Sequence, residues 1–332
     1  LLSRGLGDVY KRQAMAYRFL RTLHGLAPVA GLGAAAVGGA TALSEPWKSV
    51  KPPVQRRLTA VSDATIEAQL FVPAVPYPQW DYNWDHRDFD SHGKRRKPGM
   101  AGAAGARRRH IILVRHGQYQ ERKLDDEERI LTPLGRAQAD ACGARVAELV
   151  LQKGAVCRAV HSSTMSRARE TADIIAKHLP GVRRAVDGGL CEGVPCHAIP
   201  GGIHHSAAVY RDGARVEAAF RRYFKRALPY DETDDDDDDD EFAATGNFAK
   251  PKPGDPTDEY DVIVCHANVI RFLFLRALQL PPETWLRLCT MNCSITYLTI
   301  SPSGHVAARL MGDVGHLKPD QITFGEHKGF NW

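Results

Sequence analysis

From about residue 110 to residue 310, two patterns of apolar and polar residues take turns along the chain, one typical of strands and one typical of helices. Short apolar runs have the length of strands, and those at 111–114 and 262–265 are unbroken, as in strands buried on both faces of a parallel sheet. Longer stretches place apolar residues every three to four positions, which predicts amphipathic helices. The predicted strands lie near 111–114, 156–160, 262–265, 295–300 and 305–310, and the helices over 133–151, 166–179, 216–228 and 269–278. This alternation indicates a three-layer α/β/α sandwich around a mostly parallel sheet.

The first 109 residues lack this pattern. Residues 1–14 resemble translated adapter sequence, so we take them as a non-native leader and begin the natural protein at Met15. Residues 15–43 include a run of nineteen uncharged residues, 25–43, dominated by Ala and Gly. That length is close to the minimum for a spanning helix, and the hydrophobicity is weak. The segment is predicted to be a membrane anchor or a cleaved targeting peptide, with a disordered tail as the third alternative.

Residues 44–109 are rich in Pro and Gly and are predicted to form an extended linker. Within it, Trp80 and Trp84 stand four residues apart, with aspartates beside them. Large aromatic side chains are costly to expose, and such a linker offers them little surface of its own chain. Burial against a neighbouring subunit is therefore favoured, and packing onto the chain's own folded domain is the alternative.

We place the folded domain at residues 110–318, followed by a tail at 319–332. Residues 231–259 interrupt this domain with seven consecutive aspartates at 234–240. Such a run repels itself and buries no core, so it is predicted to be a disordered surface loop. Calcium binding is the less favoured alternative, because no glycine pattern would fix the chain around an ion.

Two of the predicted strands end in a histidine. Arg115, His116 and Gly117 follow the run 111–114, and His266 follows the run 262–265, with Asn268 two residues later. The carboxyl ends of parallel strands meet at one edge of an open sheet, where such sheets bind ligands. The sequence therefore predicts two imidazoles in one pocket.

Two further segments between these strands carry charged candidate site residues, one a cation suited to an anion and one a carboxylate. Arg167 follows a serine-rich stretch and enters the helix predicted from 166, so exposed backbone N–H groups and a forked cation occur together. Glu192 lies in a loop bounded by Gly189 and Pro195. A solvated loop carboxylate is the alternative interpretation of Glu192.

The ordered set of Arg115-His116-Gly117, Arg167, Glu192 and His266 resembles the histidine phosphatase, or phosphoglycerate mutase, superfamily. The resemblance covers about residues 110–318 and implies a phosphoglycerate mutase-like fold. It implies phosphoryl transfer without a metal or another cofactor.

Within this resemblance, His116 is the expected nucleophile and forms a phosphohistidine, which divides one difficult displacement into two easier ones. Its attacking nitrogen must be neutral, which requires a hydrogen bond from the other ring nitrogen, for example to a backbone carbonyl at Gly117. Glu192 is the expected general acid and then base. The expected phosphate contacts are Arg115, Gly117, Gln118, Arg167, His266 and Asn268.

A narrower resemblance is to mitochondrial serine/threonine protein phosphatases of the same superfamily. The motif Trp-Asp-x-Asn-Trp-Asp carries it, formed here by Trp80, Asp81, Asn83, Trp84 and Asp85. It implies that this motif drives homo-oligomer formation and activates the catalytic domain, which we expect to occur by ordering a loop near the pocket. It also implies phosphorylated protein substrates and an anchor at 25–43 in the mitochondrial inner membrane, with the outer membrane as the alternative.

Other functions stay open at this point. A small-molecule phosphatase or mutase of the superfamily is one alternative, although the predicted domain lacks the long insertions that cap the pocket of glycolytic mutases. A mitochondrial scaffold that acts mainly by binding through residues 44–109 is the alternative from another class.

Composition narrows the choice only slightly. The formal charge of +5 is mild and does not indicate nucleic acid, and the clusters 94–97 and 107–109 are expected to be solvated linker. Seven cysteines without a Cys-x-x-Cys pair favour reduced thiols. No Gly-rich phosphate loop and no metal-ligand spacing are present, and His161 and Arg271 are expected to make structural contacts.

Overall fold

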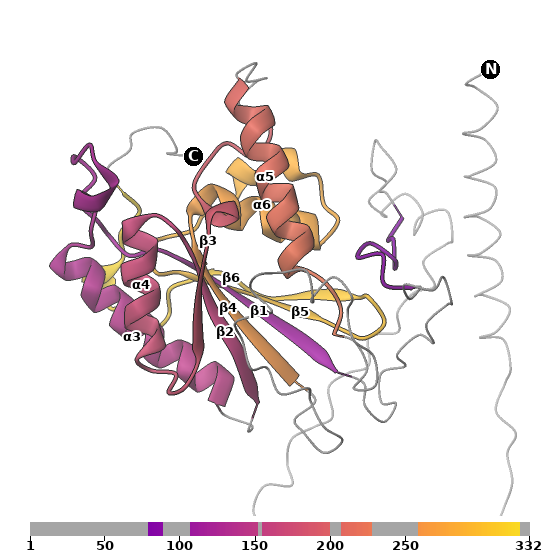
Figure 1. Ribbon diagram of the computed structural model, residues 1–332, viewed down its shortest axis with the longest axis horizontal. Coiled ribbons are helices and arrows are strands. Elements are labelled where there is room, and N and C mark those ends of the chain that lie inside the picture. The colour runs from indigo at the N-terminus through magenta and orange to yellow at the C-terminus, as the bar shows by residue number, and fades with distance from the viewer. Residues whose placement is uncertain (1–78, 89–106, 152–154, 200–206, 228–257, 326–332) are drawn as a thin grey trace, which may run out of the picture. The chain divides into compact units, whose positions relative to one another are not determined.

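A computed structural model describes residues 79–88, 107–151, 155–199, 207–227 and 258–325 (Figure 1). The described strands form one sheet in the order β3-β2-β4-β1-β5-β6. The first four in that order run parallel to one another, while β5 pairs antiparallel with β1, and β6 antiparallel with β5. The strand bounds are β1 Arg108–Arg115, β2 Val156–Ser163, β3 Arg183–Asp187, β4 Asp258–Cys265, β5 Ile295–Ile300 and β6 Val306–Asp313.

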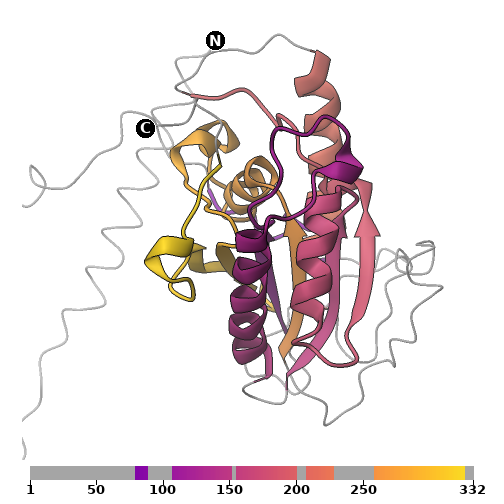
Figure 2. The same cartoon turned by 90° about the vertical axis from the view of Figure 1, so that its left-hand side faces the viewer.

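Helices cover both faces of the sheet. Ile112 and Val114 of β1 pack with α3 (Pro133–Leu151) and α4 (Ser166–Ala176), which lie side by side in Figure 2. The alternate residues Ile111 and Leu113 pack on the other face with α5 and α6, as Figure 1 shows. All four β1 side chains are fully buried, which is why this run is apolar throughout. The remaining helices are α5 Ala207–Tyr223, α6 Ala267–Ala277, and the 3-10 turns η1 Asp126–Glu128, η2 Gly188–Leu190, η4 Pro282–Arg287 and η5 Pro319–Gln321.

The predicted three-layer α/β/α sandwich with a mostly parallel sheet is confirmed, and all five predicted strands are present. The strand β3 was not predicted, because only Ala185 and Asp187 of its five residues are buried at this edge of the sheet. Helix α4 ends at Ala176 rather than at 179, and α5 begins at Ala207 rather than at 216.

The expectation that the cluster 107–109 is solvated linker is wrong, because β1 already includes Arg108 and Arg109. The buried Arg109 guanidinium lies 2.5 Å from an Asp261 carboxylate oxygen and donates to the carbonyl of Lys225 at 3.2 Å. Burial alone would raise the pKa of Asp261, but the charges of Arg109 and Arg158 lower it. The folded domain therefore depends on a buried ion pair at the start of β1.

Replacing Arg109 with Met is expected to lower the free energy of unfolding by about 3–5 kcal/mol, because Asp261 loses the main partner of its buried charge. Arg108→Met is the matched control. Arg108 pairs with Asp258 at 2.8 Å while half exposed, so its loss should cost no more than about 1 kcal/mol. Urea unfolding measures both losses, and equal losses would contradict a special role for the buried pair.

Several predicted segments lie outside the described residues. These are the leader 1–14, the anchor or targeting segment 15–43, most of the linker 44–109, most of the acidic insertion 231–259, and the end of the tail beyond 325. Among the residues that the structure describes, no helix is both long enough and apolar enough to cross a membrane.

Candidate active site

The two predicted histidines meet at one edge of the sheet. Strands β1 and β4 are parallel neighbours in which Arg115 is the register partner of Cys265, so the residue after each strand end lies beside the other. The ring centroids of His116 and His266 are 5.0 Å apart, and both side chains are buried. The backbone N–H of His116 donates to the carbonyl of Cys265 at 3.0 Å. The strand ends thus place two imidazoles in one small volume.

His116 is held in one tautomer by its own turn. Its Nδ1 lies 2.9 Å from the carbonyl oxygen of Gly117, so Nδ1 carries the proton and Nε2 keeps its lone pair. Burial, with the charges of His266, Arg115 and Arg167 adding to it, holds the pKa of His116 well below its ordinary value. A neutral imidazole with a free Nε2 is the form that can attack phosphorus.

The turn after His116 requires glycine. A Cβ on Gly117 would lie 2.6 Å from the carbonyl oxygen of Gly135 at the start of α3, which is closer than real Cβ contacts occur. The Gly117 N–H donates to the Thr171 hydroxyl at 3.0 Å. The turn is therefore fixed between α3 and α4, and the hydrogen bond that sets the His116 tautomer is fixed with it.

Arg167 lies in the first turn of α4 and points at His116. Its Nε is 3.3 Å from His116 Nε2, its Nη1 is 3.5 Å from an oxygen of Asp126, and its guanidinium carbon is 4.6 Å from the Tyr119 ring centroid. Arg115 is also buried and donates from Nη1 to the carbonyl of Thr290 at 2.8 Å. Arg167 therefore contacts the unprotonated nitrogen of His116, and the charge of the buried Arg115 also acts on His116, so the two guanidiniums form a candidate anion site.

Glu192 follows η2 on a loop that α5 and α6 hold. Arg215 of α5 donates to the carbonyls of Gly189, Cys191 and Glu192, at 2.9, 2.6 and 3.3 Å. Desolvation raises the pKa of Glu192, although the Gly193 N–H and the charges of Arg115 and Arg167 oppose that shift. A carboxyl group with a raised pKa near two guanidinium groups is suited to donate a proton.

His266 is held by the end of β2. Its Nε2 lies 2.9 Å from the hydroxyl oxygen of Ser163, the last residue of that strand. Burial, with the charges of Arg167 and Arg115 adding to it, holds the pKa of His266 well below its ordinary value. His266 is therefore a neutral hydrogen-bonding group in this arrangement.

Three expected phosphate contacts make other contacts, and those of Gly117, with Thr171 and His116, are given above. The side-chain oxygen of Gln118 accepts from the Thr132 hydroxyl at 2.8 Å, and the Asn268 amide donates to the carbonyl of Gly193 at 3.1 Å. Asn268 thus positions the loop that carries Glu192. His161 lies 3.5 Å from Asp261, in agreement with its expected structural contact.

Three residues that hold the site were not predicted from the sequence. Ser163 contacts His266, Thr171 contacts Gly117, and the Asn292 amide donates to the carbonyl of His116 at 3.1 Å. Ser163 belongs to the serine-rich stretch before Arg167, so its position was visible in the sequence. Thr171 and Asn292 reach the site only through the packing of α4 and of the segment before β5. No group of three or more His, Cys, Asp or Glu residues in the described ranges is arranged to hold a metal ion.

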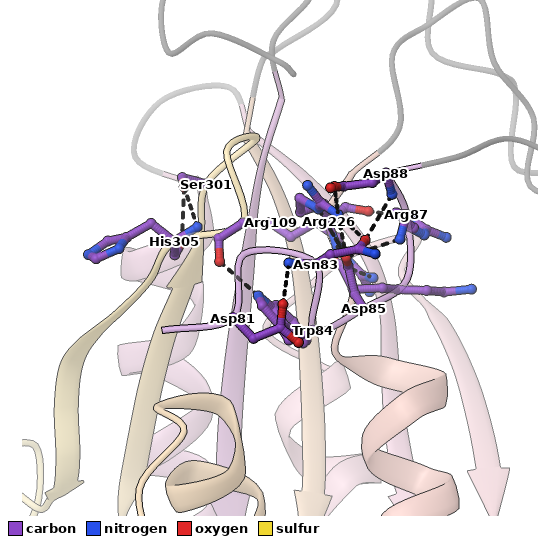
Figure 3. A network of polar contacts seen from close by, with 12 residues as sticks. Asp81, Asn83, Trp84, Asp85, Arg87, Asp88, Arg109, Arg226, Ser301 and His305 are labelled. Carbon is purple, nitrogen blue, oxygen red and sulfur yellow. Dashed lines mark hydrogen bonds and ion pairs between the residues drawn. The ribbon is translucent and has the colours of Figure 1, made fainter. Parts of the chain in front are cut away.

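The tryptophan motif packs onto its own chain, which was the alternative interpretation (Figure 3). Trp84 donates from Nε1 to the carbonyl of Gly304 at 2.7 Å, and Trp80 lies 5.5 Å from the His305 ring. The expectation that the chain offers the tryptophans little surface is therefore wrong: the turn between β5 and β6 supplies it.

Asp85 of the same motif forms an ion pair with the folded domain. Figure 3 shows Asp85 pointing at Arg226, which lies just after α5. Arg226 Nη2 is 2.5 Å from one Asp85 oxygen, and the Arg226 backbone N–H donates to the other at 2.7 Å. Burial alone would raise the pKa of Asp85, but hydrogen bonds from Arg226 lower it. In the same segment, Asp81 accepts from the Asn83 N–H at 2.9 Å, so the turn is also held locally.

Comparison with known proteins agrees with this geometry. A profile of the histidine phosphatase superfamily (branch 1) matches residues 111–195 and 250–312. The chain is 42% identical over 258 residues to the human protein "Serine/threonine-protein phosphatase PGAM5, mitochondrial", covering 74% of this chain and 80% of that protein. The protein of the same name from Xenopus tropicalis is 38% identical over 272 residues, covering 76% of this chain and 85% of that protein.

Among solved structures, a phosphoglycerate mutase from Plasmodium falciparum is 30% identical to the chain. The match covers 66% of this chain and 99% of that one, with a TM-score of 0.41.

Proposed function

Because the chain belongs to the histidine phosphatase superfamily, and within it to the PGAM5 serine/threonine-protein phosphatases, we propose that it dephosphorylates phosphoserine and phosphothreonine in proteins through a phosphohistidine. The observation that carries this proposal is the state of His116. Its Nδ1 is hydrogen-bonded to the carbonyl of Gly117, and its Nε2 lies 3.3 Å from Arg167 Nε. This contact supports the proposed roles of His116 as nucleophile and Arg167 as the cation that holds the phosphate.

In the first step, the lone pair of His116 Nε2 attacks phosphorus, and the bond from phosphorus to the serine or threonine oxygen breaks. Arg115 and Arg167 stabilise the charge on the three equatorial oxygens, and His266 donates one further hydrogen bond to one of them. Glu192 gives its proton to the leaving oxygen. The products are the free hydroxyl side chain and phosphohistidine.

In the second step, the Glu192 carboxylate takes a proton from water as that water attacks phosphorus. The bond between Nε2 and phosphorus then breaks, inorganic phosphate leaves, and Glu192 is protonated again. The raised pKa of Glu192 supports both roles, because the pH at which its acid and base forms coexist then lies closer to neutral.

The protein substrate is supported by the relatives, which are named serine/threonine-protein phosphatases. Steady-state assays of the full chain on phosphoserine and phosphothreonine peptides, with 3-phosphoglycerate in parallel, test this choice. Turnover of peptides well above that of 3-phosphoglycerate is expected. The reverse preference would favour the small-molecule phosphatase or mutase.

The motif from Trp80 to Asp85 is proposed to promote homo-oligomer formation and to activate the catalytic domain. Trp84 is only half-buried on its own chain, so further apolar surface is available to a neighbouring subunit. The motif lies at the Arg109 end of β1, because Ile300 before the β5–β6 turn pairs with Arg109. The expected loop near the pocket is therefore not what this motif contacts.

Replacing Trp80 and Trp84 together with Ala is expected to lower both the oligomer mass and the phosphatase rate while the domain stays folded. Removing apolar contact area costs roughly 25 cal/mol per Å², which amounts to several kcal/mol for two such side chains. Light scattering and phosphopeptide kinetics measure the two effects. Tyr210→Ala is the matched control, since Tyr210 is an exposed aromatic residue of α5, outside the motif, with 68% exposure. A double variant that dissociates and keeps full activity would separate assembly from activation.

Localisation in mitochondria is supported by the names of the relatives. We propose that residues 25–43 anchor the protein in the inner mitochondrial membrane, on the length and uncharged composition of that run. Carbonate extraction of mitochondria that express the full chain, or the chain without residues 25–43, tests the anchor. Extraction of both forms would contradict it.

A further inference from the structure

The segment after η5 crosses the catalytic domain beside the active site. Gln138 of α3 donates its amide to the carbonyl of Gln321 at 2.6 Å and to the Thr323 hydroxyl at 2.9 Å. The Asn292 backbone N–H donates to the carbonyl of Thr323 at 2.9 Å, and the Thr323 hydroxyl donates to the Asn292 side chain at 2.9 Å. Residues 321–325, which we call the C-terminal strap, are therefore fixed by two buried amide side chains.

The same two amides hold the backbone of the catalytic turn. The side-chain oxygen of Gln138 accepts from the Gln118 N–H at 2.8 Å, and the Asn292 amide donates to the carbonyl of His116 at 3.1 Å. Both amide side chains belong to fully buried residues. The position of the strap is thus tied to the position of the nucleophile by hydrogen bonds on both sides.

The strap brings an aromatic ring to two arginines. The guanidinium carbon of Arg115 lies 5.2 Å from the Phe324 ring centroid, and that of Arg271 lies 5.8 Å from it. Both arginines are buried, and Arg271 lies on α6 one turn after Asn268, which it contacts at 3.4 Å. An aromatic face attracts cations at these distances, and more strongly where water is excluded.

Without that ring, two like charges would face each other at the wall of the phosphate site. Burial lowers the pKa of Arg115, and the charge of Arg271 lowers it further. The charge of Glu192 acts in the opposite direction. The negative face of the ring offsets this repulsion and restrains the Arg115 side chain, whose Nη1 is also bonded to Thr290.

We infer that Phe324 is a positioning residue of the phosphate site, whose ring face, shared with Arg271, holds Arg115 in place for the phosphate group. The inference deepens the proposed phosphatase function and rests on it for the identity of the ligand. Phe324 itself touches no reacting atom in this scheme and acts through Arg115.

The test is titration calorimetry of the full chain with inorganic phosphate, together with kinetics on a phosphoserine peptide. Phe324→Ala and Phe324→Leu should each weaken phosphate binding about fivefold and raise KM by a similar factor, because a cation–π contact is lost. The value of kcat should change less, because phosphate is held in both the bound and the transition state. Phe324→Tyr keeps the ring face and should rescue binding.

Ile322→Ala is the matched control, because Ile322 lies in the same strap and is 38% exposed. It should bind phosphate as the parent chain does. Equal binding by the Leu and Phe forms would overturn the inference, since Leu keeps the apolar bulk without the ring. If Phe324→Ala does not fold, the comparison of Leu with Tyr still decides. Phosphate binding without any peptide turnover in the parent chain would instead count against the proposed function.

Discussion

Replacing His116 with Ala is expected to abolish turnover, with a loss on the order of 10³-fold or more, and to remove acid-labile phosphate from the enzyme. The expectation rests on the unprotonated Nε2, which lies 3.3 Å from Arg167 Nε, and on the hydrogen bond from Nδ1 to the Gly117 carbonyl. Loss of the nucleophile leaves only the charge stabilisation by Arg115 and Arg167, which cannot form the covalent intermediate. Trapping labelled phosphate on the enzyme by rapid acid quench measures the intermediate directly.

His178→Ala is the control for that experiment. His178 follows α4 and pairs with Asp140 at 2.8 Å on the surface, so its loss should change neither turnover nor labelling. Near-normal turnover of the His116 variant would remove His116 as the nucleophile and leave His266 as the candidate.

Replacing Glu192 with Gln is expected to slow hydrolysis of a phosphoserine peptide by about 10²- to 10³-fold, and of p-nitrophenyl phosphate by about tenfold or less. The serine alkoxide is a poor leaving group that needs a proton, whereas nitrophenolate leaves without one. Single-turnover formation of the phosphoenzyme on each substrate measures the first step alone. Equal losses on both substrates would indicate that Glu192 positions the phosphate instead.

The same residue predicts a pH dependence. Desolvation raises the pKa of Glu192, so its acid form persists to higher pH than in an ordinary glutamate. Phosphoenzyme formation from phosphoserine should be fast below that pKa and should fall as pH rises through it. The Gln variant should lack this decline. A decline that persists in the variant would assign it to another group.

The central part of the fold was predictable because each of its strands has a recognisable apolar pattern within its own few residues. Strand β1 and strand β4 are buried on both faces, and each contains an unbroken run of four apolar residues, 111–114 and 262–265. Strand β3 lies at the edge and buries only alternate residues, and its two arginines give it the composition of a loop. Helix α5 begins at Ala207, where an alanine pair and the polar residues that follow give little amphipathic signal before Val216.

The grouping of the candidate site residues was predictable for a different reason. Each of Arg115, His116 and His266 directly ends or follows a parallel strand, so chain position alone placed them together. Thr171 and Asn292 come from a helix face and a loop, and their use depends on packing that no local pattern records. Phe324 belongs to the same group, because its partners lie far away in the sequence.

The position of the tryptophan motif has a thermodynamic consequence. Asp85 binds Arg226, the preceding Lys225 accepts a hydrogen bond from Arg109, and Arg109 is the second residue of the strand that ends at Arg115. The two sites are therefore separated by the length of β1, roughly 20 Å at about 3.3 Å per residue. If docking of the motif tightens phosphate binding at the far end of that strand, linkage requires phosphate to tighten docking of the motif by the same factor. An anion in the pocket would then slow exchange of the amide hydrogens at the other end of the sheet, in a segment that the anion never touches.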